Sequence, residues 1–157
     1  MSTKNVQSTH KNIRLREFHV ALLEIVGAMN RPQRDEEVIR TAGVSLDRAL
    51  FPLLAVVERF GPIGIVELAD RIGRDYTTVS RQVAKLEGLG LIDRQANPTD
   101  RRIREVVATE AGLAMTEQID GAREKIAQTI FANWDLQDVQ DLTRLVCKFA
   151  DELKSET

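Results

Sequence analysis

The spacing of apolar residues between positions 65 and 89 constrains the fold of this chain more than any other feature. A short helix is predicted over Ile65–Ile72, followed by a turn at 73–75 and a second helix over Tyr76–Leu89. Asp75 is the expected N-cap of the second helix. The positions expected to be buried are Val66, Ala69 and Ile72 in the first helix and Val79, Val83 and Leu86 in the second. A short helix, a glycine-containing turn and a second helix form the pattern of a helix-turn-helix.

A β-hairpin is predicted directly after this helix pair. Its strands cover Leu91–Gln95 and Ile103–Thr109, and the residues between them, 96–102, combine turn chemistry with two arginines. A helix-turn-helix followed at once by such a hairpin predicts a winged helix-turn-helix head over residues 61–112.

Helices are predicted on both sides of the head. Asn12–Asn30 and Leu46–Phe60 carry apolar residues at helical spacing, and Pro52 requires the second of these helices either to bend or to begin there. Gln33–Gly43 fits either a short helix or an ordered loop. After the head, two apolar stripes are separated by a corner at Asn133–Asp135. The fold class is therefore mainly α with a small β-hairpin, a single domain over residues 1–157 in which helical regions at 12–60 and 113–157 flank the winged head.

The charge distribution favours a nucleic-acid partner more than the net charge does. The whole chain has a net charge of -2, whereas residues 73–104 hold seven Lys or Arg against four Asp or Glu, a local net charge of +3. A basic surface on an acidic chain is typical of a DNA-binding protein, although an ordinary solvated face also produces such a count.

The side of the 76–89 helix that faces away from its apolar stripe carries the first candidate DNA contacts. Arginine and glutamine can bond to base edges in the major groove, and threonine and lysine suit phosphates and thymine methyl groups. Polar residues are common on exposed helix faces, so this face gains weight mainly from the hairpin that follows it. The candidates are Thr77, Thr78, Arg81, Gln82 and Lys85.

The hairpin tip carries the second group of candidates: Asp100, Arg101 and Arg102. An arginine at the tip of a wing can enter the minor groove, where the negative potential is strongest when the groove is narrow. We expect the Asp100 carboxylate to accept from the Arg102 guanidinium and to aim it. The alternative is a solvated turn with a weak surface ion pair.

Several short motifs between residues 65 and 112 follow one pattern. They are Leu68-Ala69, Thr78-Val79-Ser80-Arg81, Leu86-Glu87-Gly88-Leu89-Gly90-Leu91-Ile92, Asn97-Pro98-Thr99-Asp100-Arg101-Arg102 and Thr109-Glu110-Ala111-Gly112. Together they resemble the multiple-antibiotic-resistance regulator (MarR) family of winged helix-turn-helix transcription regulators. The wing pattern Asp, any residue, Arg is a hallmark of that family and is intact at Asp100-Arg101-Arg102. The resemblance covers about a third of the chain and adds Ser80 to the expected DNA-binding residues.

The resemblance implies a homodimer in which the first helix and the last two helices of each subunit intertwine. The apolar stripes from Leu15 to Met29 and from Leu136 to Leu153 suit that role, since one small head covers three long amphipathic helices poorly. It further implies a repressor that binds a pseudo-palindromic double-stranded DNA operator and is released by a small aromatic effector. No cofactor or metal is implied.

Other function classes find less support in the sequence. An enzyme is not expected, because no phosphate loop, dinucleotide fingerprint or zinc-ligand spacing is present. His19 is expected in the core, with an effector cavity as the alternative, and Cys147 is expected to be a buried thiol without a peroxide-sensing role. A winged module that binds proteins instead of DNA remains the alternative function. With one cysteine, no apolar run long enough for a membrane and no signal peptide, the expected location is a reducing cytoplasm.

Overall fold

The computed structural model describes the backbone of residues 3–155 and the side chains of residues 14–155. The fold is mainly α with a small antiparallel sheet, which confirms the predicted fold class. In this range the elements are α1 (Thr3–Met29), α2 (Pro32–Ala42), α3 (Phe51–Phe60), β1 (Ile63–Gly64), α4 (Ile65–Ile72), α5 (Tyr76–Gly88), β2 (Ile92–Ala96), β3 (Arg104–Ala108), α6 (Glu110–Ile130) and α7 (Leu136–Ser155).

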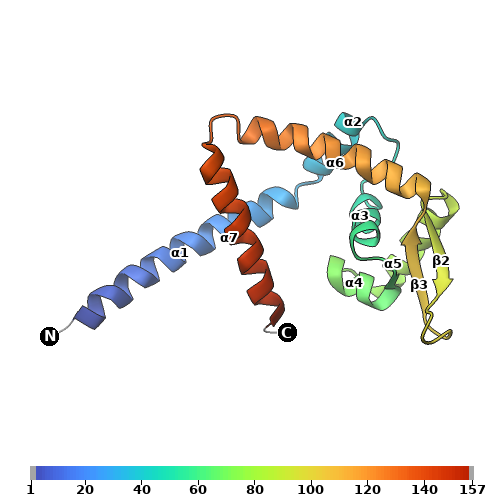
Figure 1. The fold of residues 1–157 in the computed structure, drawn as a ribbon, viewed down its shortest axis with the longest axis horizontal. Helices are drawn as coiled ribbons and strands as arrows, with labels where there is room; N and C mark the ends of the chain where they lie inside the picture. Colours follow the sequence, from blue (N-terminus) through green and yellow to red (C-terminus); the bar gives the residue numbers. More distant parts are fainter. Residues whose placement is uncertain (1–2, 156–157) are drawn as a thin grey trace.

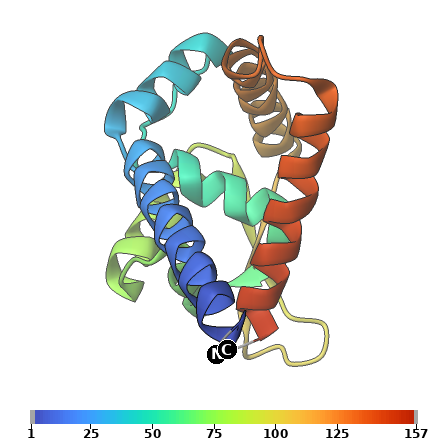
Figure 2. The ribbon, with the colours of Figure 1, turned by 90° about the vertical axis from the view of Figure 1, so that its left-hand side faces the viewer.

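The elements separate into a head and a set of long helices (Figure 1). Helices α3, α4 and α5 and the sheet form the head, and the β2–β3 connection projects from it as a wing. Helix α6 leads away from the sheet, and α7 returns from its far end toward α1. Figure 2 shows that α1 and α7 move apart toward the end of α1 that leads to α2 and the end of α7 that follows α6. These two helices therefore do not pack together along their whole length.

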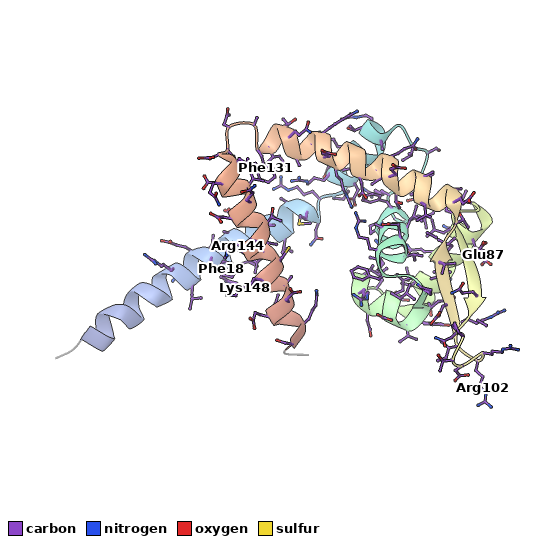
Figure 3. The ribbon with its side chains drawn as sticks, in the orientation of Figure 1. Phe18, Glu87, Arg102, Phe131, Arg144 and Lys148 are labelled. Carbon is purple, nitrogen blue, oxygen red and sulfur yellow. The ribbon has the colours of Figure 1, made fainter. Side chains whose placement is uncertain are left out.

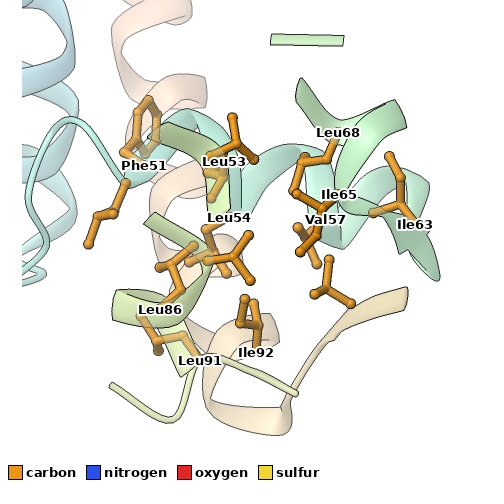
Figure 4. Close-up of a cluster of buried hydrophobic side chains, with 14 of the residues drawn as sticks. Phe51, Leu53, Leu54, Val57, Ile63, Ile65, Leu68, Leu86, Leu91 and Ile92 are labelled. Atoms are coloured by element: carbon orange, nitrogen blue, oxygen red, sulfur yellow. The ribbon is translucent and has the colours of Figure 1, made fainter. Parts of the chain in front are cut away.

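The core of the chain lies within the head (Figure 4). Leu53 and Leu54 of α3 meet side chains of α4, α5 and the sheet, and both are fully buried. The stripe predicted for α5 is confirmed, because Val79, Val83 and Leu86 are also fully buried.

The buried face of α4 differs from the prediction. Val66 is 66% exposed, whereas Leu68 is fully buried together with Ile65 and Ala69. A helix of only two turns carries more than one row of apolar residues at three-residue spacing. Packing against α3 and α5 selects the row, and the spacing alone does not.

Turn residues settle the two segments that the sequence left open. Helix α3 begins at Phe51 with Pro52 in its first turn, a position where a missing N–H costs nothing. The other segment forms helix α2 (Pro32–Ala42), and Gly43, with a left-handed φ of 68°, is its C-cap. The Gly61–Pro62 peptide bond is cis.

The sheet contains one strand that the sequence did not predict. Its order is β1-β3-β2, with Ile63 of β1 and Arg94 of β2 on either side of Val106. Strand β1 has only two residues, too few for an alternating pattern to be visible. It ties the start of α4 to the base of the wing.

Helix α6 is joined to the head by one threonine and one close backbone approach. The Thr109 hydroxyl donates to the Gly90 carbonyl oxygen (2.6 Å) and accepts from the Gly112 N–H (3.1 Å), so it caps α6 and also holds the end of the α5 segment. Gly112 packs against the Leu91 carbonyl oxygen, where a Cβ would collide with the backbone.

Helices α1 and α7 expose many of their apolar residues in the single chain. On α7 no residue is buried, and Leu136, Leu145 and Val146 are each more than half exposed. On α1, Leu15, Leu23 and Ile25 are likewise more than half exposed. Phe18 of α1 meets Phe149 of α7 edge to face, with ring centroids 5.2 Å apart (Figure 3).

Two expectations about these helices are wrong for the single chain. His19 is exposed, not in the core, and the Cys147 thiol is exposed, not buried. Both residues lie on helices that the head does not cover, which explains why an apolar pattern in the sequence did not correspond to burial.

We predict that Gly112→Ala destabilises the fold by about 1–3 kcal/mol, because the backbone of Leu91 cannot yield as a flexible side chain would. Gly121→Ala is the matched control on the same helix. Its Cβ meets nothing within 4 Å, so helix propensity should make it neutral or stabilising by up to about 1 kcal/mol. Urea unfolding followed by circular dichroism measures both, and equal stabilities of the two variants would contradict the close approach.

Candidate nucleic-acid interface

The start of α5 is fixed by the expected N-cap. The Asp75 carboxylate accepts from the Thr78 N–H (2.8 Å) and from the Thr78 hydroxyl (2.6 Å). The hydroxyl bond, followed by the backbone bond, lowers the pKa of Asp75 below its usual 3.8, so the cap is charged at neutral pH. Thr78, predicted as a DNA contact, therefore already donates its hydroxyl proton within the cap and retains only its capacity to accept.

The exposed side of α5 carries three of the predicted residues in one row. Thr77, Arg81 and Lys85 are exposed and follow one another at four-residue spacing, which places them on the same helix face. Ser80 is half-buried at the edge of this row. The buried stripe of α5 anchors the opposite side, so the row faces away from the head core.

Gln82 occupies a different environment from the other α5 candidates. It is half-buried, and its side-chain oxygen accepts from Arg74 Nη1 at 2.9 Å. The same Arg74 nitrogen donates to the Ala49 carbonyl oxygen at 2.7 Å. Sequence reasoning treated Arg74 only as a turn residue, and no spacing rule connects it to residue 49.

The wing loop is shaped by two side chains that bond to its own backbone. Asn97 Oδ1 accepts from the N–H groups of Thr99 (2.8 Å) and Asp100 (3.0 Å). Asp100 Oδ1 accepts from the Arg102 N–H at 3.0 Å. The expectation that Asp100 holds the Arg102 guanidinium is therefore wrong. A short carboxylate in a tight turn reaches the backbone two residues ahead before it reaches a long side chain.

The arginines of the wing tip are free to meet a ligand. Arg101 and Arg102 are exposed, and Figure 3 shows Arg102 projecting from the tip, away from the head. Among the residues that the structure describes, no ion pair within 4.0 Å engages Arg81, Arg101 or Arg102. Their charges are thus available to an anionic surface.

A cleft separates the wing from the helix pair and adds residues that sequence reasoning missed. Its lining includes Tyr76 at the start of α5, Arg94 of β2 and Arg104 of β3, together with Arg102. Arg94 is paired with Glu87 at 2.9 Å, whereas Tyr76 is 55% exposed. The local excess of basic residues over 73–104 was the signal that included Arg94 and Arg104.

Comparison with known proteins places this geometry in a family. The MarR family model matches residues 46–103, which include α3 to α5, β1, β2 and the wing tip. An uncharacterised helix-turn-helix transcriptional regulator of Bacillus subtilis, YxaD, is 31% identical over 94 residues, 60% of this chain and 66% of that protein. A MarR family protein from Bacillus stearothermophilus has the same fold, with a TM-score of 0.74 over 91% of this chain and 97% of that one, at 17% identity. Residues 46–103 thus match the MarR family, and the chain has the fold of a MarR family protein.

A second relative of this chain is named as a repressor. The transcriptional repressor IacR of Pseudomonas putida is 25% identical over 103 residues, 66% of this chain and 62% of that protein. The matched segment thus spans a little under two thirds of each of these two relatives.

Two further properties of the described residues bear on other types of site. No group of three or more His, Cys, Asp or Glu side chains in this part of the chain is arranged to hold a metal ion. None of the helices described combines the length and apolar character needed to cross a membrane.

Proposed function

We propose that this chain is a MarR-family transcription regulator that binds a specific double-stranded DNA operator. The observation that carries the proposal is the exposed row of Thr77, Arg81 and Lys85 beside a wing tipped with unpaired arginines. The major groove admits one α-helix, so α5 would lie in it with this row on the base edges and phosphates. Arg102 would reach the adjacent minor groove, with Arg101 and Ser80 on the flanking backbone.

A repressor is the form of regulation we favour, because IacR of Pseudomonas putida is named as one. The expected compartment is the cytoplasm, where an operator is accessible. A protein-binding winged module is the alternative, and its partner would have to match the same free arginines. Binding to duplex DNA that weakens steeply with salt separates the two functions, since phosphate contacts release counterions.

We predict different effects for arginines of the helix and of the wing. Arg81→Ala should cost about 1–3 kcal/mol on the cognate duplex and relax its base preference, as expected for a lost base contact. Arg102→Ala should weaken binding to cognate and random duplexes alike and reduce the salt dependence. Fluorescence titration at two salt concentrations measures both.

Arg48→Ala is the matched control for these variants, because it removes an exposed arginine that pairs with Glu36 instead of pointing from the wing. It should leave the binding of every duplex unchanged. If Arg102→Ala matches Arg48→Ala on all duplexes, the wing does not contact DNA. Asp100→Ala tests the loop separately, since it removes the bond that shapes the backbone before Arg102.

We propose a homodimer in which α1, α6 and α7 of two copies cover one another. Exposed apolar side chains run along α1 and α7, and a monomeric protein rarely exposes contiguous apolar patches of this extent. A second copy is the occupant that suits both helices at once, because a two-fold pairing buries the same stripe in each partner. Paired heads would then read the two halves of a pseudo-palindrome.

The assembly is tested by sedimentation at micromolar concentration, where the protein should have twice its chain mass of 17.6 kDa. Leu145→Lys places a charge in the α7 stripe and should shift the protein toward monomer. Gln137→Lys introduces the same charge at an exposed polar position of α7 and serves as control. A folded monomer for the parent protein would refute the dimer.

We propose further that a small aromatic acid releases the operator. A cavity of about 240 Å³ lies between α1, α2, α3 and α6. Its lining includes Met29, Asp35, Phe51, Arg123 and Ile126. Arg123 lies over the Phe51 ring, 4.8 Å from its centroid. Burial and then the charge of Arg59 lower the pKa of Arg123, and together they outweigh the opposing charges of Asp120 and Asp35, so a further anion would relieve an unfavourable environment. An aromatic carboxylate offers the anion and an apolar ring together.

Thermal-shift measurements with benzoate and related acids test this proposal. Benzoate should raise the melting temperature of the parent protein, and operator DNA should reduce that increase, because coupling between two sites is reciprocal. Arg123→Met should abolish the increase, whereas Arg48→Ala should retain it. If no aromatic acid shifts the parent protein, effector control of this kind is refuted.

A further inference from the structure

One half of the Gln82 amide group is engaged by Arg74. Its oxygen accepts from Arg74 Nη1 at 2.9 Å. An arginine side chain donates and never accepts, so the amide atom facing it must be the oxygen and not the nitrogen. The NH₂ group of Gln82 takes part in no hydrogen bond found among the described residues.

The bond from Arg74 is held in place by a second contact. The two hydrogens of Arg74 Nη1 serve the Gln82 oxygen and the Ala49 carbonyl oxygen, which lies just before α3. Both bonds are partly buried and assisted by the guanidinium charge, which makes them stronger than neutral ones. Turning Gln82 around to free its oxygen would leave Arg74 half satisfied in a half-buried position.

This orientation bears directly on base readout. A glutamine that recognises adenine uses both ends of its amide: the oxygen accepts from N6 and the nitrogen donates to N7. Guanine instead offers two neighbouring acceptors, N7 and O6, in the major groove. Arg74 occupies one of the two lone pairs of the Gln82 oxygen, whereas both N–H donors of the NH₂ group remain unused, so the amide suits guanine better than adenine.

We propose that Arg74 is a positioning residue that makes Gln82 act mainly as a hydrogen-bond donor, so that the operator carries guanine instead of adenine at the base that Gln82 meets. The inference rests on the proposed DNA-binding function. It assigns a specificity role to the turn of the helix-turn-helix, which directly precedes α5.

Selection of bound duplexes from a random pool tests the proposal. The base pair read by Gln82 is the one whose preference disappears in Gln82→Met, and the parent protein should favour guanine over adenine there by about fivefold or more, the lower range for a base contact. Arg74→Met should reverse this order, because it frees the Gln82 oxygen. Circular dichroism establishes that each variant is folded.

Gln82→Glu distinguishes the loss of the amide N–H donors from the loss of the hydrogen bond with Arg74. A carboxylate still accepts from Arg74 but has no proton to donate at neutral pH. It should lose the guanine preference as Gln82→Met does, while remaining the more heat-stable of the two. An adenine preference in the parent protein, retention of the guanine preference in Gln82→Glu, or no base pair that responds to Gln82→Met would overturn the inference.

The outcomes also distinguish this inference from the proposed function. If the parent protein selects no duplex at all, the function has failed. If it selects an operator that Arg81→Ala relaxes but Gln82→Met leaves unchanged, only the role of Gln82 has failed.

Discussion

Every candidate contact on this molecule depends on the apolar cluster that joins α3, α4, α5 and the sheet. Burying a leucine or valine side chain stabilises a fold by about 1.5–3 kcal/mol, and α5 alone contributes three fully buried side chains to the cluster. Because that stripe is fixed, the opposite row of Thr77, Arg81 and Lys85 is fixed as well. The cluster thus determines which polar side chains of α5 face outward.

Sequence periodicity predicted the parts of this molecule whose structure is local. Helix α4, the cap at Asp75 and the stripe of α5 follow from short-range rules, and the family motifs lie within the same segment. The rules failed where a distant partner decides the outcome. Leu68 rather than Val66 is buried because of packing against other helices, and strand β1 exists only because β3 lies beside it.

The candidate site shows the same division at the level of single side chains. Arg81 stands on the exposed face as the spacing indicates, whereas the Gln82 oxygen accepts from Arg74, which also donates to a carbonyl group near α3. Asp100 serves the backbone and not the guanidinium, since the turn geometry that favours this bond is visible only in three dimensions. Polar residue type therefore indicated the candidate interface, and hydrogen-bond geometry determined which of its atoms remain available.

The double role of Thr109 has a mechanical consequence. Its hydroxyl joins the first turn of α6 to the carbonyl that ends the α5 segment, and the missing side chain of Gly112 lets the two backbones touch. Helix α6 has 21 residues and is therefore about 30 Å long at a rise of 1.5 Å per residue. Because the first turn of α6 is held against the head, a tilt of about 6° at that turn displaces the far end of the helix by about 3 Å relative to the head. In a paired molecule, the separation of the two heads is then determined by an angle at this joint.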